Sequence, residues 1–504
     1  MTGKWRGKNW ASCEYWVHGS KFNAKNSMSW TKKEILAATG GRIAREAKQN
    51  LFGEVVTDSS KVKKGSVFVA LKGERLDGHR FVPEALKRGA ACVIVHRNVP
   101  GSTKLTTGGS TSGEAIPSGV TVVRVEDTLR ALGDLAHYRR QKFAPKVIAI
   151  TGSNGKTTTK EMAAAIFDEA VLNGRRLRGK VLKTEGNFNN LVGLPLTLLR
   201  LRPSHKVAIV EIGTNRPGEV QRLAEIAAPD MGIITAVSAA HLEGLNSLAG
   251  VAREKGELFR NLRPGGAIAV NLDDPRVRRL GAKFKGRKIS YGKRGSVRAQ
   301  GVQLRDAQGT RFTLCAGARR CPVRLRYLGR HNISNAVGAA ALALGLGASL
   351  AAVRRGLEKA KPYAMRMEAD SWRGAGIIND AYNANPASME AALKTLAAMG
   401  GKGEKIAVLG DMFELGKASG REHTELGKRV AKERIDRLYL LGPQAALVKA
   451  GARSGGMGEE KIIIGKDHGA VARHLRGHVK KGDWLLIKGS RGMKMEKVLD
   501  ALKG

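Results

Sequence analysis

The stretch VIAITGSNGKTTTKEMAAAIF, residues 147–167, decides the fold of this chain. Its first residues are β-branched and apolar, as in a buried strand, and they lead through a glycine-bearing loop into a helical pattern. Glycines in such a loop let the backbone approach an anion, and the N–H groups at the helix start point at it. The stretch therefore predicts a phosphate-binding loop between a strand and a helix.

This loop is shorter than the usual pattern G-x-x-x-x-G-K-[ST], because Ile150 stands where that pattern has its first glycine. Lys156 supplies a positive charge for phosphate oxygens, and Thr157 supplies a hydroxyl for Mg²⁺. An ordinary turn with a solvated lysine is the alternative, but it does not account for three successive threonines. We therefore expect the phosphate groups of a ligand, which the family resemblance given below identifies as ATP, to be bound by Gly152, Ser153, Asn154, Gly155, Lys156, Thr157 and Thr158.

Length and composition favour a soluble protein of several α/β domains. At 504 residues, with about 150 residues per domain, three domains are expected. The four cysteines are widely scattered, which favours reduced thiols, and no secretory signal is visible at the N-terminus. We therefore expect a cytoplasmic protein. The uncharged run at 334–353 consists mainly of alanine and glycine, so we expect a buried helix there and no membrane span.

The formal charge of +44 is unusually high for an enzyme. It permits either nucleic-acid binding or a basic surface without a specific partner. The basic residues are dispersed, and aromatic residues make up only 5% of the chain. We therefore expect no specific nucleic-acid partner, although salt-sensitive retention of polyanions should occur.

Strand and helix signals divide the chain into four parts. Short apolar runs that alternate with helices predict a mostly parallel, doubly wound sheet in the central part, and the last part repeats this pattern. Strand signals between Lys288 and Tyr327 predict an antiparallel addition, and residues 101–119 have the composition of a surface loop. The expected parts are a basic extension at 1–28, a small α/β domain at 29–143, a central P-loop domain at 144–361 and a Rossmann-like domain at 362–504.

Three residues after the phosphate loop are candidates for chemistry. Glu211 ends an apolar run, so its carboxylate is well placed to bind Mg²⁺, although a capping or ion-pair role is the alternative. His241 follows another expected strand, where a lone histidine is often structural. Lys255 lies on an amphipathic helix, where a solvated position is the plain interpretation.

Further along, amides and charges adjoin expected elements. Asn332 and Asn335 share one face of a helix and match the donor and acceptor of a purine edge, although Asn332 also suits a helix cap. Arg366 and Asp380 lie next to strands and suit phosphate oxygens and ribose hydroxyls respectively. A surface ion pair is the alternative for either residue.

The order of these motifs resembles the Mur ligase family from about residue 29 to the C-terminus. The resemblance rests on TGSNGKTTT, GNFNN, VEIGTNRPGE, AHLEG, EKGELF, GRHNISNA, MRME, NDAYNANP, LGDMFELG and KGSRGMKME. DAYNANP and GNFNN point to the member that acts on UDP-N-acetylmuramoyl-tripeptide and D-alanyl-D-alanine. The resemblance implies a monomeric three-domain ligase that uses ATP and Mg²⁺ to form an acyl phosphate, with the UDP end of the substrate on the N-terminal domain.

The resemblance also implies roles for single residues. Thr157 and Glu211 would bind Mg²⁺, His241 would serve a second ion, and Lys255 would be carried as a carbamate. Asn332 and Asn383 would lie at the adenine, Asp380 at the ribose and Arg366 at the phosphates. Lys156, His241, Lys255 and Arg366 form the expected catalytic set. The expected substrate-binding set is Ser59, Lys72, Asp77, His79, Thr184, Asn187, Asn189 and Asn190, with Lys488, Ser490 and Arg491 near the incoming dipeptide.

The chain departs from the family at one of these positions. The family commonly has Asp-Ser-Arg where this chain has Asp58, Ser59 and Ser60, which removes one expected contact near the UDP. Two other activities remain open. A folylpolyglutamate or cyanophycin-type ligase shares the ATP-binding half, and a basic P-loop NTPase could act on nucleic acid.

Overall fold

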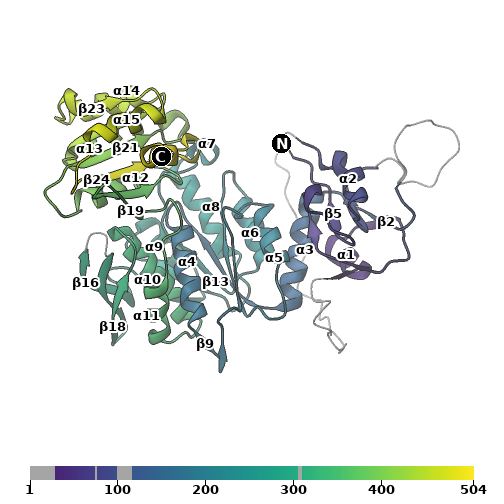
Figure 1. The fold of residues 1–504 in the computed structure, drawn as a ribbon. Helices are drawn as coiled ribbons and strands as arrows, with labels where there is room; N and C mark the ends of the chain where they lie inside the picture. The colour runs from purple at the N-terminus through teal and green to yellow at the C-terminus, as the bar shows by residue number, and fades with distance from the viewer. Residues whose placement is uncertain (1–28, 74–75, 99–115, 305–308) are drawn as a thin grey trace.

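The structure is a computed structural model, and it describes residues 29–73, 76–98, 116–304 and 309–504. The expected extension at 1–28 and most of the expected loop at 101–119 lie outside the described residues. Three main sheets follow one another along the chain, and in Figure 1 the N-terminal and C-terminal sheets lie on different sides of the central one. No helix of the described part is long and apolar enough to cross a membrane.

The N-terminal sheet has five strands in the order β2-β7-β6-β5-β4, and only the β2–β7 pair is antiparallel. Strands β1 and β3 form a separate two-stranded antiparallel sheet. Helix α1 begins at a capping box formed by Thr31 and Glu34 and stops at Gly40, whose φ of 61° favours glycine. The elements are β1 (Trp30–Thr31), α1 (Lys32–Thr39), β2 (Arg42–Arg45), β3 (Leu51–Phe52), β4 (Val55–Val56), η2 (Ser59–Lys61), β5 (Val67–Val69), η3 (Gly78–Phe81), α2 (Val82–Lys87), β6 (Cys92–Val95) and β7 (Thr121–Arg124).

The central sheet has nine strands in the order β11-β12-β8-β13-β14-β15-β16-β17-β18. Pairing is parallel from β11 to β16 and antiparallel from β16 to β18, which confirms a parallel sheet with an antiparallel addition. The addition begins at Val297, later than expected, because β15 still pairs in parallel. The strands are β8 (Lys146–Thr151), β11 (Val181–Lys183), β12 (Val207–Glu211), β13 (Met231–Ile234), β14 (Ala267–Asn271), β15 (Arg287–Tyr291), β16 (Val297–Leu304), β17 (Thr310–Ala316) and β18 (Arg319–Leu325).

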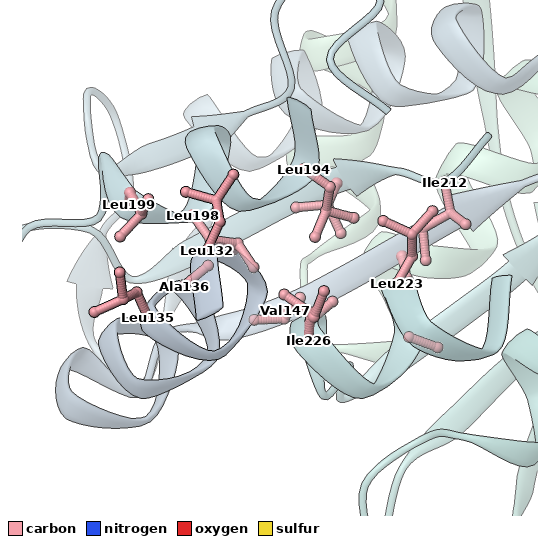
Figure 2. Packing of buried hydrophobic residues seen from close by; sticks show 14 of the residues in the cluster. Leu132, Leu135, Ala136, Val147, Leu194, Leu198, Leu199, Ile212, Leu223 and Ile226 are labelled. Carbon is pink, nitrogen blue, oxygen red and sulfur yellow. The ribbon is translucent and has the colours of Figure 1, made fainter. Parts of the chain in front are cut away.

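Helices cover both faces of this sheet. Alternate residues of β8 point to opposite sides of the sheet, and each set packs against the helices on its own side. Val147 and Ala149 join one apolar cluster with leucines of α3, α5 and α6, part of which Figure 2 shows. Ile148 and Ile150 join the other cluster with α4, α10 and α11. The helices are α3 (Thr128–Phe143), α4 (Lys156–Asp168), α5 (Gly193–Leu199), α6 (Glu219–Ala227), α7 (Leu242–Leu245), α8 (Leu248–Arg260), α9 (Pro275–Ala282), α10 (Arg330–Gly345) and α11 (Leu350–Lys359), and a hairpin of β9 (Val171–Leu172) and β10 (Arg175–Arg176) follows α4.

The C-terminal sheet has six strands in the order β19-β20-β24-β21-β22-β23, parallel except for β19. Helices α12, α13 and α14 cover one face, and α15 and α16 cover the other. The elements are β19 (Glu368–Trp372), β20 (Ala375–Asp380), α12 (Pro386–Ala397), β21 (Lys405–Gly410), η5 (Gly416–Ala418), α13 (Ser419–Lys432), β22 (Arg437–Leu441), α14 (Ala445–Ser454), η6 (Glu459–Lys461), β23 (Ile462–Ile464), α15 (His468–His478), β24 (Trp484–Lys488), η7 (Arg491–Met493) and α16 (Glu496–Lys503).

The order of the central strands fixes where a ligand binds. The chain leaves β8, forms β11 and β12 on one side, and then returns to form β13 and β14 on the other side. In doubly wound sheets the crevice at such a reversal, at the carboxyl ends of the strands, is the usual ligand site. The loop at 152–155 lies at this end of β8, directly before α4.

Candidate active site

The loop between β8 and α4 has a backbone that only glycine permits at two positions. Gly152 has a φ of 148° and Gly155 a φ of 82°. A Cβ atom at Gly152 would lie 1.9 Å from Thr235 Oγ1, and one at Gly155 would lie 2.3 Å from Asn335 Oδ1. The two glycines therefore permit a close backbone turn at the N-terminus of α4, which favours anions.

Thr157 and Glu211 lie side by side although 54 residues separate them in sequence. The Thr157 hydroxyl donates to Glu211 Oε2 at 2.9 Å, and both side chains are buried. Asn189 Nδ2 donates to Glu211 Oε1 at 2.9 Å, so a second loop orients the same carboxylate. The expected pair of oxygen ligands for Mg²⁺ therefore lies at one point beside the loop.

Two lysines lie near this pair, the partly buried Lys156 and the buried Lys255. Lys156 Nζ donates to the Gly152 carbonyl at 2.7 Å, and burial together with the charge of Arg366 lowers its pKa, while Glu211 opposes the shift. Lys255 is 1% exposed on α8, which excludes the solvated position. Burial and the charge of Lys156 lower the pKa of Lys255 to about 7, so half of the amine is neutral at that pH.

Asn332 and Asn335 both face the cavity from the start of α10, but they also bind each other. Asn335 Nδ2 donates to Asn332 Oδ1 at 2.9 Å, and Asn332 Nδ2 donates to the Leu328 carbonyl at 2.8 Å. Asn332 is not the helix cap, because α10 is capped at Gly329. A purine edge at Asn332 would therefore have to share or replace these bonds.

Arg366 enters the cavity from the segment between α11 and β19. Its guanidinium lies 4.0 Å from the centre of the Tyr382 ring, and in the described part of the chain its buried Nε has no hydrogen-bond partner. The flanking residues Met365 and Met367 have φ angles of 57° and 52°, which are strained for methionine. A buried, unpartnered guanidinium nitrogen on a strained backbone suits an anionic ligand.

Asp380 and the buried Lys488 form an ion pair at the ends of adjacent strands β20 and β24. Lys488 Nζ lies 2.5 Å from Asp380 Oδ2 and also donates to the Asn383 carbonyl at 2.9 Å. Lys488 is therefore held among the residues expected at the ribose. Met367 N donates to Asp380 Oδ1 at 3.1 Å, which leaves the carboxylate largely occupied by protein partners.

The remaining two residues expected near the dipeptide differ in exposure. Ser490 is 2% exposed, and its hydroxyl accepts from Phe413 N at 2.8 Å. Arg491 is half exposed, and its guanidinium pairs with Glu496 at 2.7 Å. Both residues line the same cavity as the phosphate loop.

Two contacts join the central and C-terminal domains at the cavity. Asn154 and Asn385 exchange amide hydrogen bonds of 2.8 Å and 3.2 Å. His241 Nδ1 lies 2.6 Å from Glu414 Oε2, and these two residues have φ angles of 54° and 62°. Non-glycine residues with such angles are uncommon and cluster at functional sites.

The cavity between the two domains has a volume of about 410 Å³, within the range of small-molecule sites. The sequence-predicted residues that line it are Ser153, Asn154, Gly155, Lys156, Thr157, Thr158, His241, Asn332, Arg366, Asp380, Asn383, Lys488, Ser490 and Arg491. Thr157 lines the cavity and donates a hydrogen bond to Glu211, which lies directly behind it. The loop at 409–415, which the resemblance places near the incoming dipeptide, contributes Glu414 to the lining, whereas sequence reasoning missed His331, Tyr382 and Asn385.

The expected residues of the N-terminal domain lie on a different sheet and do not line this cavity. Asp77 accepts from Arg97 Nη2 at 2.6 Å and from His79 Nδ1 at 2.7 Å. The pKa of Asp77 is lowered to about 2. The hydrogen bond from the backbone N–H of His79 contributes most to this shift, and the side chains of His79 and Arg97 add to it. The Ser59 hydroxyl donates to Glu84, and Lys72 forms an isolated bridge with Asp77.

The expected residues between β11 and α5 are mostly held by protein partners. Thr184 is fully buried, and its hydroxyl accepts from Glu211 N at 3.0 Å. Asn190 Oδ1 accepts from Val192 N and Gly193 N at the start of α5. Asn187 is exposed, so of this group it is the residue best placed to meet a ligand from solvent.

Models of one protein family match most of the chain. The Mur ligase middle domain matches residues 150–343, the Mur ligase glutamate ligase domain matches 365–491, and the Mur ligase family catalytic domain matches 52–140. Two similar proteins are named UDP-N-acetylmuramoyl-tripeptide–D-alanyl-D-alanine ligase. The one from Bacillus subtilis is 34% identical over 94% of this chain and 98% of its own length. The one from Escherichia coli is 35% identical over 89% of this chain and 93% of its own length.

Solved structures extend the comparison. A crystal structure of MurF from Acinetobacter baumannii matches with a TM-score of 0.83 and 33% identity, over 94% of this chain and 99% of that one. MurF from Thermotoga maritima in complex with ADP matches with a TM-score of 0.76 and 29% identity, over 89% of this chain and 97% of that one. Folylpolyglutamate synthase from Mycobacterium tuberculosis shares the fold at 17% identity.

Proposed function

This chain belongs to the Mur ligase family, and from that premise we propose that it adds D-alanyl-D-alanine to UDP-N-acetylmuramoyl-tripeptide in an ATP-dependent ligation. The observation that carries the proposal is the cavity where the phosphate loop and the unpartnered Arg366 Nε face each other from two domains. The relatives that share 33–35% identity over nearly their whole length carry this activity in their names.

The chemistry explains why ATP is needed. A carboxylate and an amine do not form an amide in water unless the carboxylate first gains a leaving group. The terminal carboxylate of the tripeptide substrate attacks the γ-phosphorus of ATP, which releases ADP and gives an acyl phosphate. The D-alanyl-D-alanine amine then attacks that carbonyl carbon, and inorganic phosphate leaves with the bonding electron pair while the amine loses a proton.

Positioned positive charge provides most of the catalysis in phosphoryl transfer. Lys156 and Arg366 reach the cavity from opposite domains, and the charge of Arg366 contributes to the lowered pKa of Lys156. We assign both to the phosphate oxygens of ATP. Closure of the C-terminal domain brings Arg366 to the loop and keeps water from the acyl phosphate.

The donor set beside the loop fits Mg²⁺. Thr157 and Glu211 offer a hydroxyl and a carboxylate, the hard oxygen ligands that this ion prefers. The described residues contain no group of three or more His, Cys, Asp or Glu side chains arranged for a metal, so phosphate and water oxygens would complete its coordination. When bound, Mg²⁺ would offset charge on the phosphates. We assign His241 to a second ion.

The surroundings of Lys255 support the proposal that this side chain carries a carbamate. Carbon dioxide reacts with a neutral amine, and the lowered pKa of about 7 provides that form near neutral pH. The carbamate would replace the positive charge of this buried amine, which lies near Lys156, with a negative charge. Asn332 and Asn383 are proposed at the adenine and Asp380 at the ribose, as expected from the sequence.

We propose that the UDP end of the substrate lies on the N-terminal domain, near Ser59, Lys72, Asp77 and His79, and that Thr184, Asn187, Asn189 and Asn190 meet its peptide. Lys488, Ser490 and Arg491 remain proposed for the dipeptide side. The proposed division of the chain is 1–28, 29–143, 144–361 and 362–504. A cytoplasmic monomer remains our proposal, and the three described cysteines are free thiols, which suits a reducing compartment.

An acceptor assay tests this function. Purified enzyme with ATP and Mg²⁺ is offered UDP-N-acetylmuramoyl-tripeptide with D-alanyl-D-alanine, folate with glutamate, or nucleic acid, and ADP release is followed. We expect ADP release only with the first pair. Release that needs folate and glutamate would support the sibling activity, and release stimulated by DNA or RNA would support the NTPase.

A further inference from the structure

A second cavity lies on the antiparallel addition of the central domain. Strands β16, β17 and β18 and helix α11 surround it, and its volume is about 820 Å³. Over the residues that the structure describes, it shares no lining residue with the cavity at the phosphate loop. Strand β17 is five strand positions from β8, a separation of about 24 Å at the usual strand spacing.

The lining of this cavity is strongly basic. Among the described residues, four arginines and one carboxylate line it, which gives this part of the lining a net formal charge of +3. The arginines are Arg311, Arg324, Arg326 and Arg354, and the carboxylate is Glu358. Glu358 accepts from Arg324 N at 3.3 Å and lies 3.6 Å from Arg354 Nε, so one carboxylate already serves two of these residues.

Two of the arginines are neighbours across strands. Arg311 and Arg324 are direct partners in the β17–β18 ladder. Side chains directly opposite each other in an antiparallel pair lie on the same face of the sheet and within reach of one another. A ligand with several negative charges can therefore contact both guanidinium groups at once.

The neighbouring strand is also irregular at this point. The β16–β17 register shifts between Gln300 and Gln303, and Gly301 inside this shift has a φ of 60°. Such bulges are frequent beside binding sites, where they redirect side chains. Gly301 and Gln303 both line the cavity.

From these observations we propose that the cavity on β16–β18 and α11 binds a small polyphosphate-bearing ligand, such as a nucleoside triphosphate or an inorganic polyphosphate. Guanidinium forks match phosphate geometry, and the volume accommodates a nucleotide. In the described part of the lining the aromatic side chain is Phe312, which is buried, and this favours a small phosphorylated ligand over single-stranded nucleic acid, which binds by base stacking.

Calorimetric titration of the full-length protein with inorganic tripolyphosphate at 150 mM salt tests the proposal. We expect two sites in the unmodified protein, because the phosphate loop is the other. The double variant Arg324→Glu with Arg326→Glu should abolish binding at the cavity on β16–β18 and α11, or raise its Kd at least tenfold for each charge-assisted hydrogen bond that the substitutions remove. Lys156→Ala should affect the other site.

A matched control separates a site from diffuse attraction by a chain of charge +44. Arg319→Glu with Arg320→Glu makes the same charge change at the other end of β18, at exposed residues outside the lining. Equal reductions in affinity in both double variants would overturn the proposal. Hydrogen exchange gives a second measurement, because tripolyphosphate should protect β17 and β18 in the control variant and not in the lining variant. Tighter binding of a single-stranded oligonucleotide than of tripolyphosphate at these arginines would also overturn it.

Discussion

The amide pair between Asn154 and Asn385 offers a sharp test of how the two domains form one site. Asn385→Ser is the chosen change. Serine caps a helix as well as asparagine, so the bond from Ser388 N at the start of α12 is replaced, while the shorter side chain cannot reach Asn154. The variant therefore removes the interdomain bonds and keeps the helix.

The expected magnitude follows from the two interdomain bonds, of 2.8 Å and 3.2 Å, that this change removes. At about 1 kcal/mol net for each, the closed arrangement is destabilised by about 2 kcal/mol, or about 30-fold in its population. We expect kcat/KM for ATP in the ligation assay to fall by about that factor, while the melting temperature stays within about 2 °C of the original.

A double-mutant cycle checks that the effect belongs to the pair. Asn154→Ser alone removes the same two bonds, together with a 3.1 Å bond to Ser238 Oγ. The double variant should therefore be little less active than Asn154→Ser alone, because the pair is already broken. Reductions that multiply in the double variant, or an Asn385→Ser enzyme within twofold of the original, would refute the reasoning.

Three further predictions concern the loop, a histidine and a lysine. Gly155→Ala should raise the Kd for ATP more than tenfold, because it adds about 1–2 kcal/mol of backbone strain and brings the new Cβ to 2.3 Å from the Asn335 side chain. Gly179→Ala is the control. Its φ of 70° imposes similar strain, but the new Cβ would meet open space, so the Kd should stay unchanged. Burial lowers the pKa of His331 to about 4, so between pH 6.5 and 4 the unfolded chain takes up a proton that the folded protein does not, and stability falls by at most about 1.4 kcal/mol per pH unit. His331→Asn should flatten the fall in melting temperature between pH 7 and pH 5, and parallel curves would contradict this. Since Lys255 has a pKa of about 7, ligation at pH 6 in buffer freed of carbon dioxide should be slow and should recover with bicarbonate; no response at any pH would argue against the carbamate.

Local features of the fold are predictable because short stretches determine them. The phosphate loop at 152–157 and the parallel sheet follow from strand, glycine and helix patterns that neighbouring residues set. The alanine-rich run at 334–353, expected as one buried helix, is helical and largely buried in α10, but it is interrupted at 346–349 before α11 begins. The antiparallel addition begins later than its strand signals suggest, since β15 has the same strand pattern whichever way it pairs.

Features that depend on contacts between residues far apart in the sequence are harder to predict from the sequence alone. Asn385 meets Asn154 across 231 residues, and no sequence pattern marks that pairing. Lys488 is expected near the dipeptide from the sequence. In the structure it forms an ion pair with Asp380 on the neighbouring strand, a residue that is expected at the ribose. The catalytic and binding roles themselves stay predictions, because contacts between side chains establish geometry and not turnover.

Isotope transfer from the substrate carboxylate tests most directly whether ATP converts an acid into a mixed anhydride at this loop. The tripeptide substrate is labelled with ¹⁸O in its terminal carboxylate, and the phosphate released during ligation with D-alanyl-D-alanine is analysed by mass spectrometry. One ¹⁸O atom should appear in each inorganic phosphate, and Lys156→Ala should greatly reduce its formation. Unlabelled phosphate formed together with ligated product, or undiminished labelled phosphate from Lys156→Ala, would contradict the account.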